Sequence, residues 1–453
     1  MPRLETVSEF MLLSVLCTVA ALSSTCAASE LVPEDAVNNA VLYESSADDT
    51  AVEQVQFRGF QSPFFNRPTL ATTTPQRSSR SADRRLQSRQ LFAQAPATPR
   101  RRRLSRTPDM LGDSFQPPFL LTLQPQGPGG TFVKSHLSLA AGSARAKVSE
   151  HNKALPHDRI YFNYNHFQNA VQRTAFIDGV TQIVGQTANV DRFTLGGERT
   201  LFNGDMSIAM QLPLTSFPDA DVTLPGLGPA GRFKSDMGIA GNLSVVGKQL
   251  LVNSEDLLVS CGLGIELPTG ADASVLSETN LFSVENESLF LQPFVALTLD
   301  NGDAFVHSFL QLDVDVGASP LTITDLTGAA ATIAAGEITQ PTLVHWDTTT
   351  GIWLARSEEA RGITGIAAIA EFHLSSAVSS PEQLSGDVST LTGPSDFVLA
   401  PGSSRYTVSY VTAGIHAEIG QNQSLRVAGV FPLHNGVQQF FDSEVLVQFG
   451  RRY

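Results

Sequence analysis

The stretch from Val306 to Val316, VHSFLQLDVDV, alternates between two kinds of side chain. Because consecutive side chains of a β-strand point to opposite faces, a period of two indicates a strand with two different faces. The apolar face carries Val306, Ser308, Leu310, Leu312, Val314 and Val316, and the polar face carries Phe305, His307, Gln311, Asp313 and Asp315. The stretch therefore predicts a β-strand that lies between an apolar and a polar environment.

The same alternation returns along the chain, for example in Val259–Leu267, Ile366–Leu374 and Val411–Ile419. We count roughly twelve such segments of about ten residues, which is the strand length of a transmembrane β-barrel. The pattern predicts an all-β fold, an antiparallel transmembrane β-barrel of roughly 12 strands. A soluble β-sandwich, with the apolar faces in a core between two sheets, is the alternative.

Turn residues separate these segments. Asn-Gly pairs, which favour tight hairpins, occur at residues 203–204, 301–302 and 435–436. Apolar-Pro pairs at residues 212–213, 267–268 and 431–432 predict strand ends at a barrel rim, because proline removes a ladder donor. The longer polar stretches would then be extracellular loops: Thr215–Ser235, Ala271–Glu287, Ser319–Gln340 and Ser376–Ser404. One short amphipathic helix is predicted around His166–Phe176.

The N-terminal part of the chain has a different composition. An apolar run from Phe10 to Cys26 predicts a secretory signal peptide over residues 1–28, with an uncleaved anchor as the alternative. Residues 29–109 are rich in Ser, Pro and Arg and lack apolar periodicity, so we expect a disordered linker there. Its Arg100–Arg103 run is expected to be a solvated charge run and not a nucleic-acid site. The barrel is predicted to occupy residues 110–453.

The chain ends in an alternating strand with an aromatic residue last. Phe441, Val445, Val447, Phe449 and Tyr453 share one face of this strand. The segment resembles the C-terminal signal by which outer-membrane barrels are recognised by their assembly machinery, so Phe449 and Tyr453 are the predicted assembly signal. The assembly machinery is accordingly a predicted partner, and an ordinary last strand of a soluble sheet is the alternative.

The stretch Lys147–Asn165, KVSEHNKALPHDRIYFNYN, resembles an uncharacterised family of outer-membrane barrel proteins found largely in planctomycete bacteria. The resemblance extends from Met110 to Tyr453. The short segment Leu267–Gly270 is also similar to a motif in barrels associated with aromatic-compound uptake. The resemblance implies a barrel in a bacterial outer membrane and supplies no catalytic or binding residue.

Charged side chains on the polar faces define the candidate site. In a barrel they would face the lumen: Glu266, Asp313, Asp315, Asp347, Glu371, His373, His416, Glu418, Arg426, Asp442 and Glu444. Acids outnumber bases, so an open lumen should favour cations or neutral polar solutes over anions. An acid–base network that plugs the barrel has equal standing. Metal ligation would require the pair Glu371 and His373 to meet the pair His416 and Glu418, and a hydrogen-bonded polar lumen is preferred.

We therefore expect an outer-membrane barrel in contact with lipid, acting as a porin-like channel or transporter for small solutes without a cofactor or metal. A non-conducting structural or binding barrel is the runner-up, and a secreted β-sandwich comes third. No enzyme is expected, because the sequence has no G-x-S-x-G elbow. The H-x-E half of a zinc deaminase signature at His416–Glu418 lacks its cysteine partner motif, since Cys261 is the single cysteine after the leader.

Overall fold

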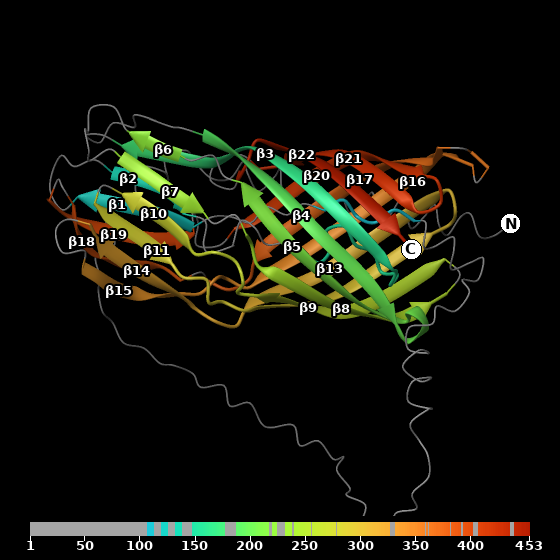
Figure 1. Cartoon of the computed structure of the whole chain (residues 1–453), viewed down its shortest axis with the longest axis horizontal. Coiled ribbons are helices and arrows are strands. Elements are labelled where there is room, and N and C mark those ends of the chain that lie inside the picture. Colours follow the sequence, from blue (N-terminus) through green and yellow to red (C-terminus); the bar gives the residue numbers. More distant parts are fainter. Residues whose placement is uncertain are drawn as a thin grey trace, which may run out of the picture. The chain divides into compact units, whose positions relative to one another are not determined.

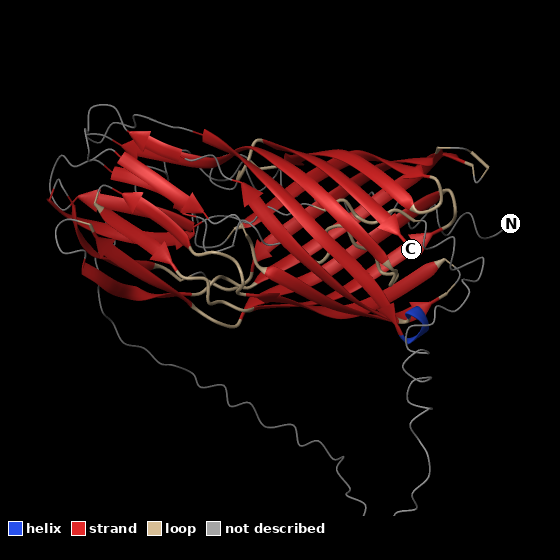
Figure 2. Cartoon of the chain, in the orientation of Figure 1, coloured by secondary structure: helices blue, strands red, loops and turns tan. Residues whose placement is uncertain are grey.

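A computed structural model describes residues 107–112, 119–125, 132–137, 147–176, 187–216, 220–223, 232–237, 240–254, 256–277, 279–326, 331–357, 359–360, 362–380, 382–390, 393–401, 406–434 and 439–453. The predicted signal peptide and nearly all of the predicted linker lie outside these residues. Within them the chain consists mainly of strands (Figure 2), with one short 3-10 turn, η3 (Phe202–Gly204). None of the helices in the described part is long and apolar enough to cross a membrane.

Twelve of the described strands pair into a closed antiparallel ring, which confirms the predicted barrel and its strand number. They are β3 (Arg159–Phe176), β4 (Thr187–Leu201), β5 (Met206–Ser216), β8 (Leu243–Asn253), β9 (Leu257–Leu267), β12 (Phe290–Asp300), β13 (Ala304–Asp315), β16 (Leu343–Arg356), β17 (Ile363–Ala377), β20 (Thr407–Ile419), β21 (Gln423–Pro432) and β22 (Ser443–Arg452). Each strand pairs with the next barrel strand in the sequence, and β22 returns to β3 (Figure 1).

The period-two pattern explains why these strands close into a barrel. In β13, Leu310 and Leu312 are 55% and 42% exposed on the outer face, whereas His307 and Gln311 are at most 1% exposed on the inner face. The strands β9, β17 and β20 alternate in the same way. Because a closed sheet has no unpaired edge, every strand of the ring can satisfy its backbone donors and acceptors in a membrane.

The two ends of the barrel differ in their connections. At one end, which we call the short-turn end, brief turns join β4 to β5, β8 to β9, β12 to β13, β16 to β17 and β20 to β21. The turns predicted at residues 203–204 and 301–302 are confirmed there, and Asn203 and Gly302 have positive φ angles of 59° and 101°. The turn predicted at residues 435–436 lies outside the described residues.

At the other end the connections carry additional strands, which together we call the cap. They are β1 (Phe119–Pro125), β2 (Phe132–Leu137), β6 (Ala220–Thr223), β7 (Arg232–Met237), β10 (Ala273–Ser277), β11 (Asn280–Val284), β14 (Ser319–Asp325), β15 (Ala331–Ile338), β18 (Leu384–Thr390) and β19 (Gly393–Pro401). Six form a separate sheet, and β1, β2, β18 and β19 extend the barrel sheet beside β3. The four predicted loops therefore contain paired strands. Their overall composition is polar, so their short runs of alternating apolar residues were not recognised as strands.

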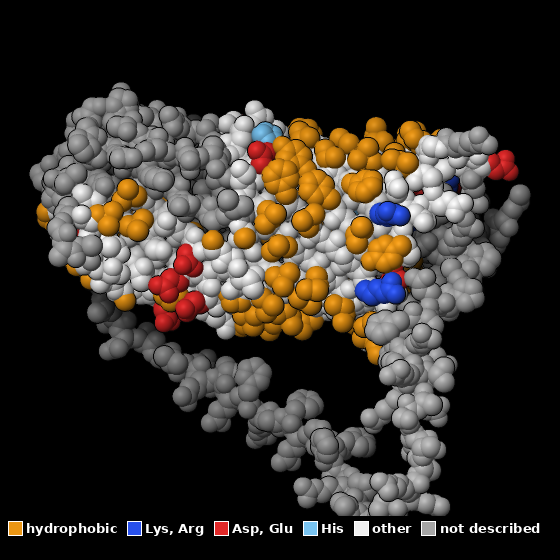
Figure 3. All heavy atoms as spheres, viewed as in Figure 1, with side chains coloured by type: hydrophobic (Ala, Val, Ile, Leu, Met, Phe, Trp, Pro, Cys, Tyr) orange, Lys and Arg blue, Asp and Glu red, His pale blue; other side chains and the backbone are white. Residues whose placement is uncertain are grey.

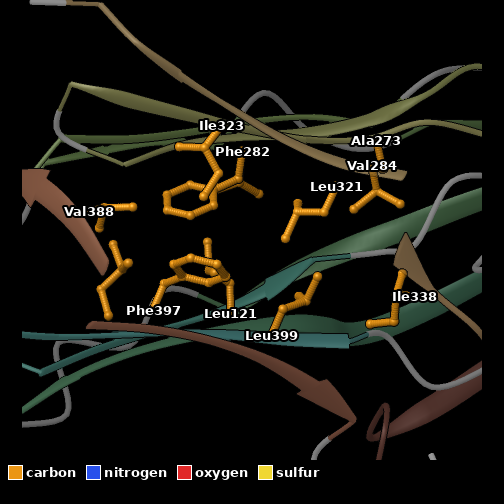
Figure 4. Packing of buried hydrophobic residues seen from close by; sticks show 12 residues of the cluster. Leu121, Ala273, Phe282, Val284, Leu321, Ile323, Ile338, Val388, Phe397 and Leu399 are labelled. Atoms are coloured by element: carbon orange, nitrogen blue, oxygen red, sulfur yellow. The ribbon is translucent and has the colours of Figure 1, made fainter. Parts of the chain in front are cut away.

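The cap has its own apolar core (Figure 4). Phe282 of β11 and Phe397 of β19 pack edge to face with ring centroids 5.7 Å apart, and Leu121 and Ile323 complete the contact. The apolar clusters of the barrel contain none of these residues. Among the described residues, cap and barrel are therefore stabilised by separate cores.

The predicted helix at His166–Phe176 is wrong, because these residues are the second half of β3. The pairing of β3 with β4 shifts register between Phe167 and Val171, and Asn169 there has a positive φ of 54°. Such a bulge interrupts the period of two. The apolar residues Phe167, Ala170 and Val171 consequently follow one another at a spacing that resembles a helix.

Proline positions agree with strand ends in two of three places. Pro268 follows β9 and Pro432 ends β21, as predicted. Pro213 instead lies inside β5, where it pairs with Thr194 of β4. The pairing of β5 with β8 stops at Gln211, before Pro213, because proline has no N–H to donate to that neighbour.

Candidate functional site

Two segments that precede the first barrel strand occupy the barrel interior. We call Thr107–Gly112 the N-terminal leg and Lys147–Asp158 the C-terminal leg. Every residue of both legs is buried except Asp109, which is partly exposed, and the Met110 N–H donates to the Asn152 carbonyl at 2.8 Å. The sequence had assigned Thr107–Asp109 to the linker and had begun the barrel at Met110. In the structure the folded part begins earlier, and the first barrel strand begins at Arg159.

The C-terminal leg is bound to the wall by ionic and polar contacts. The Lys147 Nζ lies 3.4 Å from the Asp347 carboxylate, and the Ser149 hydroxyl donates to the same carboxylate at 2.6 Å. Glu150 pairs with Arg192 of β4 at 2.8 Å, and both side chains are at most 1% exposed. The end of the leg is tied to the short-turn end, because the Thr200 N–H donates to the Asp158 carboxylate at 2.6 Å.

The N-terminal leg is held by wall side chains that bind its backbone. The Glu371 carboxylate accepts hydrogen bonds from the Leu111 and Gly112 N–H groups, both at 2.8 Å. The Gln448 amide donates to the Leu111 carbonyl at 2.6 Å. Gly112 has a φ of +85°, and a Cβ there would lie 2.8 Å from the Glu150 Cα, so only glycine fits where the two legs cross.

Most of the predicted lumen-facing side chains lie in this interior. Those at most 3% exposed are Glu266, Asp313, Asp347, Glu371, His373, His416, Glu418, Arg426 and Glu444. Asp315 is half-buried at the cap end of β13, where it accepts a hydrogen bond from the Gln340 N–H at 2.8 Å. Asp442 does not face the lumen: it precedes β22, is exposed, and accepts a hydrogen bond from the Asn169 amide at 2.6 Å.

Asp347 and Glu371 contact the legs, whereas Glu266 and Glu444 accept hydrogen bonds from the wall amides of Asn242 and Asn165. His373 lies 2.9 Å from Asp347 and 3.2 Å from Glu371, and it forms one buried group with them. Glu418 pairs instead with Arg452 at 3.2 Å, so the two acid–histidine pairs make separate contacts. Within the described ranges no group of three His, Cys, Asp or Glu side chains is arranged to hold a metal ion.

Sequence reasoning missed several charged side chains of the interior, among them Lys147, Lys153 and Lys248. Glu198 of β4, also not predicted, pairs with Arg159 at 2.9 Å and with Lys248 at 3.0 Å, and all three are buried. Lys147 and Lys153 come from the C-terminal leg. The available signal was the stretch Lys147–Asp158 itself, which is densely charged, lacks alternation and directly precedes the first barrel strand.

The outer surface of the barrel is apolar. Figure 3 shows hydrophobic side chains over the barrel strands on the face in view. Large apolar residues that are 47–56% exposed occur on many of the strands: Ile160, Leu195, Ile208, Met210, Val295, Leu310, Ile352, Ile363, Ile415, Val427, Phe431 and Val445. Phe449 and Tyr453 are 39% and 55% exposed. Phe441, which the sequence placed on the same face, is instead buried and stacks on Tyr410 at 5.1 Å.

A closed antiparallel barrel with an apolar outer face and a polar interior defines a transmembrane barrel of the bacterial outer-membrane class. No family model matches the sequence, and no curated protein sequence matches it. The chain is similar in structure to the NanC porin, at 8% identity and a TM-score of 0.33, over 65% of this chain and 98% of that one. It is also similar to an outer membrane channel from Pseudomonas putida F1, at 12% identity and a TM-score of 0.39, over 66% and 97%.

A further similar structure is the toluene transporter TbuX of Ralstonia pickettii, at 11% identity and a TM-score of 0.30, over 70% of this chain and 97% of that one. With TM-scores this low, the similarity does not identify a solute for this chain. The class assignment therefore rests on the closed ring and the apolar outer face of this chain.

Proposed function

We propose that this chain is a gated outer-membrane barrel that passes small solutes, and that its two legs close the barrel in this structure. The observation that carries the proposal is the attachment of the N-terminal leg, whose backbone is bound by Glu371 and Gln448. Water can replace such polar contacts, so the wall beneath the leg can be hydrated when the leg moves aside. We place the cap outside the cell, because long connections face outwards in outer-membrane barrels.

The N-terminal leg is the better candidate for the gate. The C-terminal leg lies between β2, in the cap, and β3, which begins at the short-turn end, so strands hold it at both ends. The N-terminal leg is anchored at its beginning by Thr107, whose hydroxyl donates to Asp300. Movement of this leg alone would open a path beside the other.

Single-channel recording in planar bilayers tests the proposal on the full chain. We expect rare openings in the wild type and about tenfold more frequent openings in Glu371→Gln, because hydrogen bonds to a charged acceptor contribute about 1.5–3 kcal/mol. A Thr107→Cys/Asp300→Cys pair, in a background where Cys17, Cys26 and Cys261 are each replaced by Ser, should close the channel when oxidised and release it on reduction. Since the wall acids outnumber the wall bases, the openings should prefer cations.

The alternative is a non-conducting structural or binding barrel. It is favoured by the complete burial of the Glu150–Arg192 pair between a leg and the wall. Silent bilayers with Glu371→Gln, from a preparation that is inserted and heat-modifiable on gels, would establish this alternative in place of the gated barrel.

A further inference from the structure

Five basic side chains surround the carboxylate of Asp109 near the short-turn end. The distances from its oxygens are 3.2 Å to Arg159 Nη1, 3.4 Å to Lys153 Nζ, 3.5 Å to Arg426 Nη2, 3.6 Å to His157 Nε2 and 3.8 Å to His151 Nε2. All five bases belong to the C-terminal leg or to the wall, whereas Asp109 belongs to the N-terminal leg. The carboxylate can therefore leave while the bases stay together.

The cluster is wider and more positive than one aspartate needs. Lys153, Arg159 and Arg426 are the cationic side chains among these bases. Glu198 shares Arg159, but it also has Lys248 as a partner at 3.0 Å. Charge-assisted hydrogen bonds are typically about 2.7–2.9 Å long, and the contacts of the Asp109 carboxylate are all longer.

A small polar cavity adjoins this carboxylate. It is lined by Asp109, Lys153 and His416, among others, and has room for about one water molecule. His416 is 3% exposed, and neither nitrogen of its ring has a hydrogen-bond partner in the described part of the chain. A buried imidazole whose nitrogens have no hydrogen-bond partner among the described residues, beside several cationic side chains, indicates a place for a polar ligand.

We propose that this basic cluster is a binding site for small carboxylates, which Asp109 occupies in cis while the N-terminal leg is in place. The proposal rests on the proposed function and names a class of ligand that acts on its gate. A free carboxylate that replaces Asp109 pairs with the same cationic side chains and loosens the leg, whose backbone Arg426 and Lys153 also bind. The ligand bound at this end of the barrel is therefore an anion, whereas the ions that pass the acids of the wall are expected to be cations.

Rescue by acetate tests the site without any channel recording. In the full chain refolded in detergent, Asp109→Ala leaves the five bases without their carboxylate, and thermal unfolding is followed with and without 100 mM acetate. For a dissociation constant of about 10 mM, acetate should shift the folding equilibrium of this variant about tenfold towards the folded state. Acetamide has the same shape without the charge, and chloride at equal ionic strength has the charge without the shape, so both should give less than half of the shift.

Asp303→Ala is the matched control, because Asp303 is an exposed acid in a turn at the same end. It should show no acetate-specific shift. If Asp109→Ala does not fold, Asp109→Ser also removes the carboxylate, leaves room for acetate and is tested in its place. Equal shifts with acetate and chloride, or equal acetate shifts in the Asp109 and Asp303 variants, would overturn the carboxylate site.

The two proposals fail separately. Acetate rescue with silent bilayers would keep the carboxylate site and remove the gated channel. Channel openings without acetate rescue would keep the gate and remove the site.

Discussion

At the scale of single residues, the interior contains charged side chains that are paired with one another and are not hydrated. Arg192 and Glu150 are 2.8 Å apart and at most 1% exposed, so neither charge is solvated when its partner is removed. Breaking one partner of a buried pair is strongly destabilising, whereas replacing both with apolar residues is far less so.

Arg192→Ala should therefore lower the free energy of unfolding by about 3–5 kcal/mol, measured by urea titration in lipid vesicles. The control is Arg199→Ala, because Arg199 is 45% exposed and its partner Asp158, at 3.2 Å, keeps the Thr200 N–H as a donor. Loss of such an exposed arginine should cost under about 1 kcal/mol. The double variant Arg192→Met/Glu150→Leu should recover most of the loss. Equal losses for Arg192→Ala and Arg199→Ala would contradict burial of the Glu150–Arg192 pair.

A second effect at this scale is the packing of aromatic rings over strand glycines. A Cβ at Gly351 would lie 2.1 Å from the Phe305 ring, whereas a Cβ at Gly247 would meet nothing closer than 3.9 Å. Both glycines lie within strands. The ring of Phe305 therefore requires a glycine at position 351, whereas the space around Gly247 would accept a larger side chain.

Gly351→Ala should cost about 1–3 kcal/mol by overpacking, while Gly247→Ala should change stability by less than about 0.5 kcal/mol. Urea unfolding in vesicles measures both. Adding Phe305→Leu to Gly351→Ala should restore part of the loss. A neutral Gly351→Ala would show that the ring moves away freely.

At the scale of elements, cap and barrel have separate apolar cores. Phe282 is fully buried in the cap core, and its ring packs against Phe397 of another cap strand. A substitution in this core should destabilise the cap strands before it destabilises the barrel strands.

Phe282→Ala should cost the cap about 3–5 kcal/mol. Limited proteolysis should then cleave within the cap connections, while the barrel still shows its heat-dependent shift on gels. Ile333→Ala in β15, where the side chain is 53% exposed, is the control and should leave the cleavage pattern unchanged. Loss of the heat-dependent shift in Phe282→Ala would mean that the barrel needs the cap to fold.

At the scale of the whole molecule, the apolar outer face of the barrel requires a bilayer. Leu310 on β13 and Leu326 after the cap strand β14 are similarly exposed, at 55% and 49%. The difference between them is that only Leu310 lies on a strand of the closed ring.

Leu310→Arg should cost about 2–4 kcal/mol of stability in vesicles, the range for a cation near the middle of a bilayer. Leu326→Arg should have little effect. The measurement is urea unfolding in vesicles, followed by tryptophan fluorescence. Equally small effects of both substitutions would contradict a membrane around β13.

The candidate site could be predicted only in part. Alternation placed Asp347, Glu371 and Glu418 on inner faces, because the position of a residue along its strand sets the face of its side chain. Alternation could not predict which residues those acids would contact. In the structure Asp347 and Glu371 belong to a buried network with the legs, and the bases of that network come partly from a segment without any periodic pattern.

The sequence by itself determined strands with one apolar and one polar face, since a period of two over about ten residues specifies such a strand. Tertiary structure alone decided between a barrel and a sandwich, placed the two legs inside the ring and paired the long connections into a cap. The reason is distance along the chain: Glu371 holds Leu111 across 260 positions, and such a contact exists only after the ring has closed around the legs.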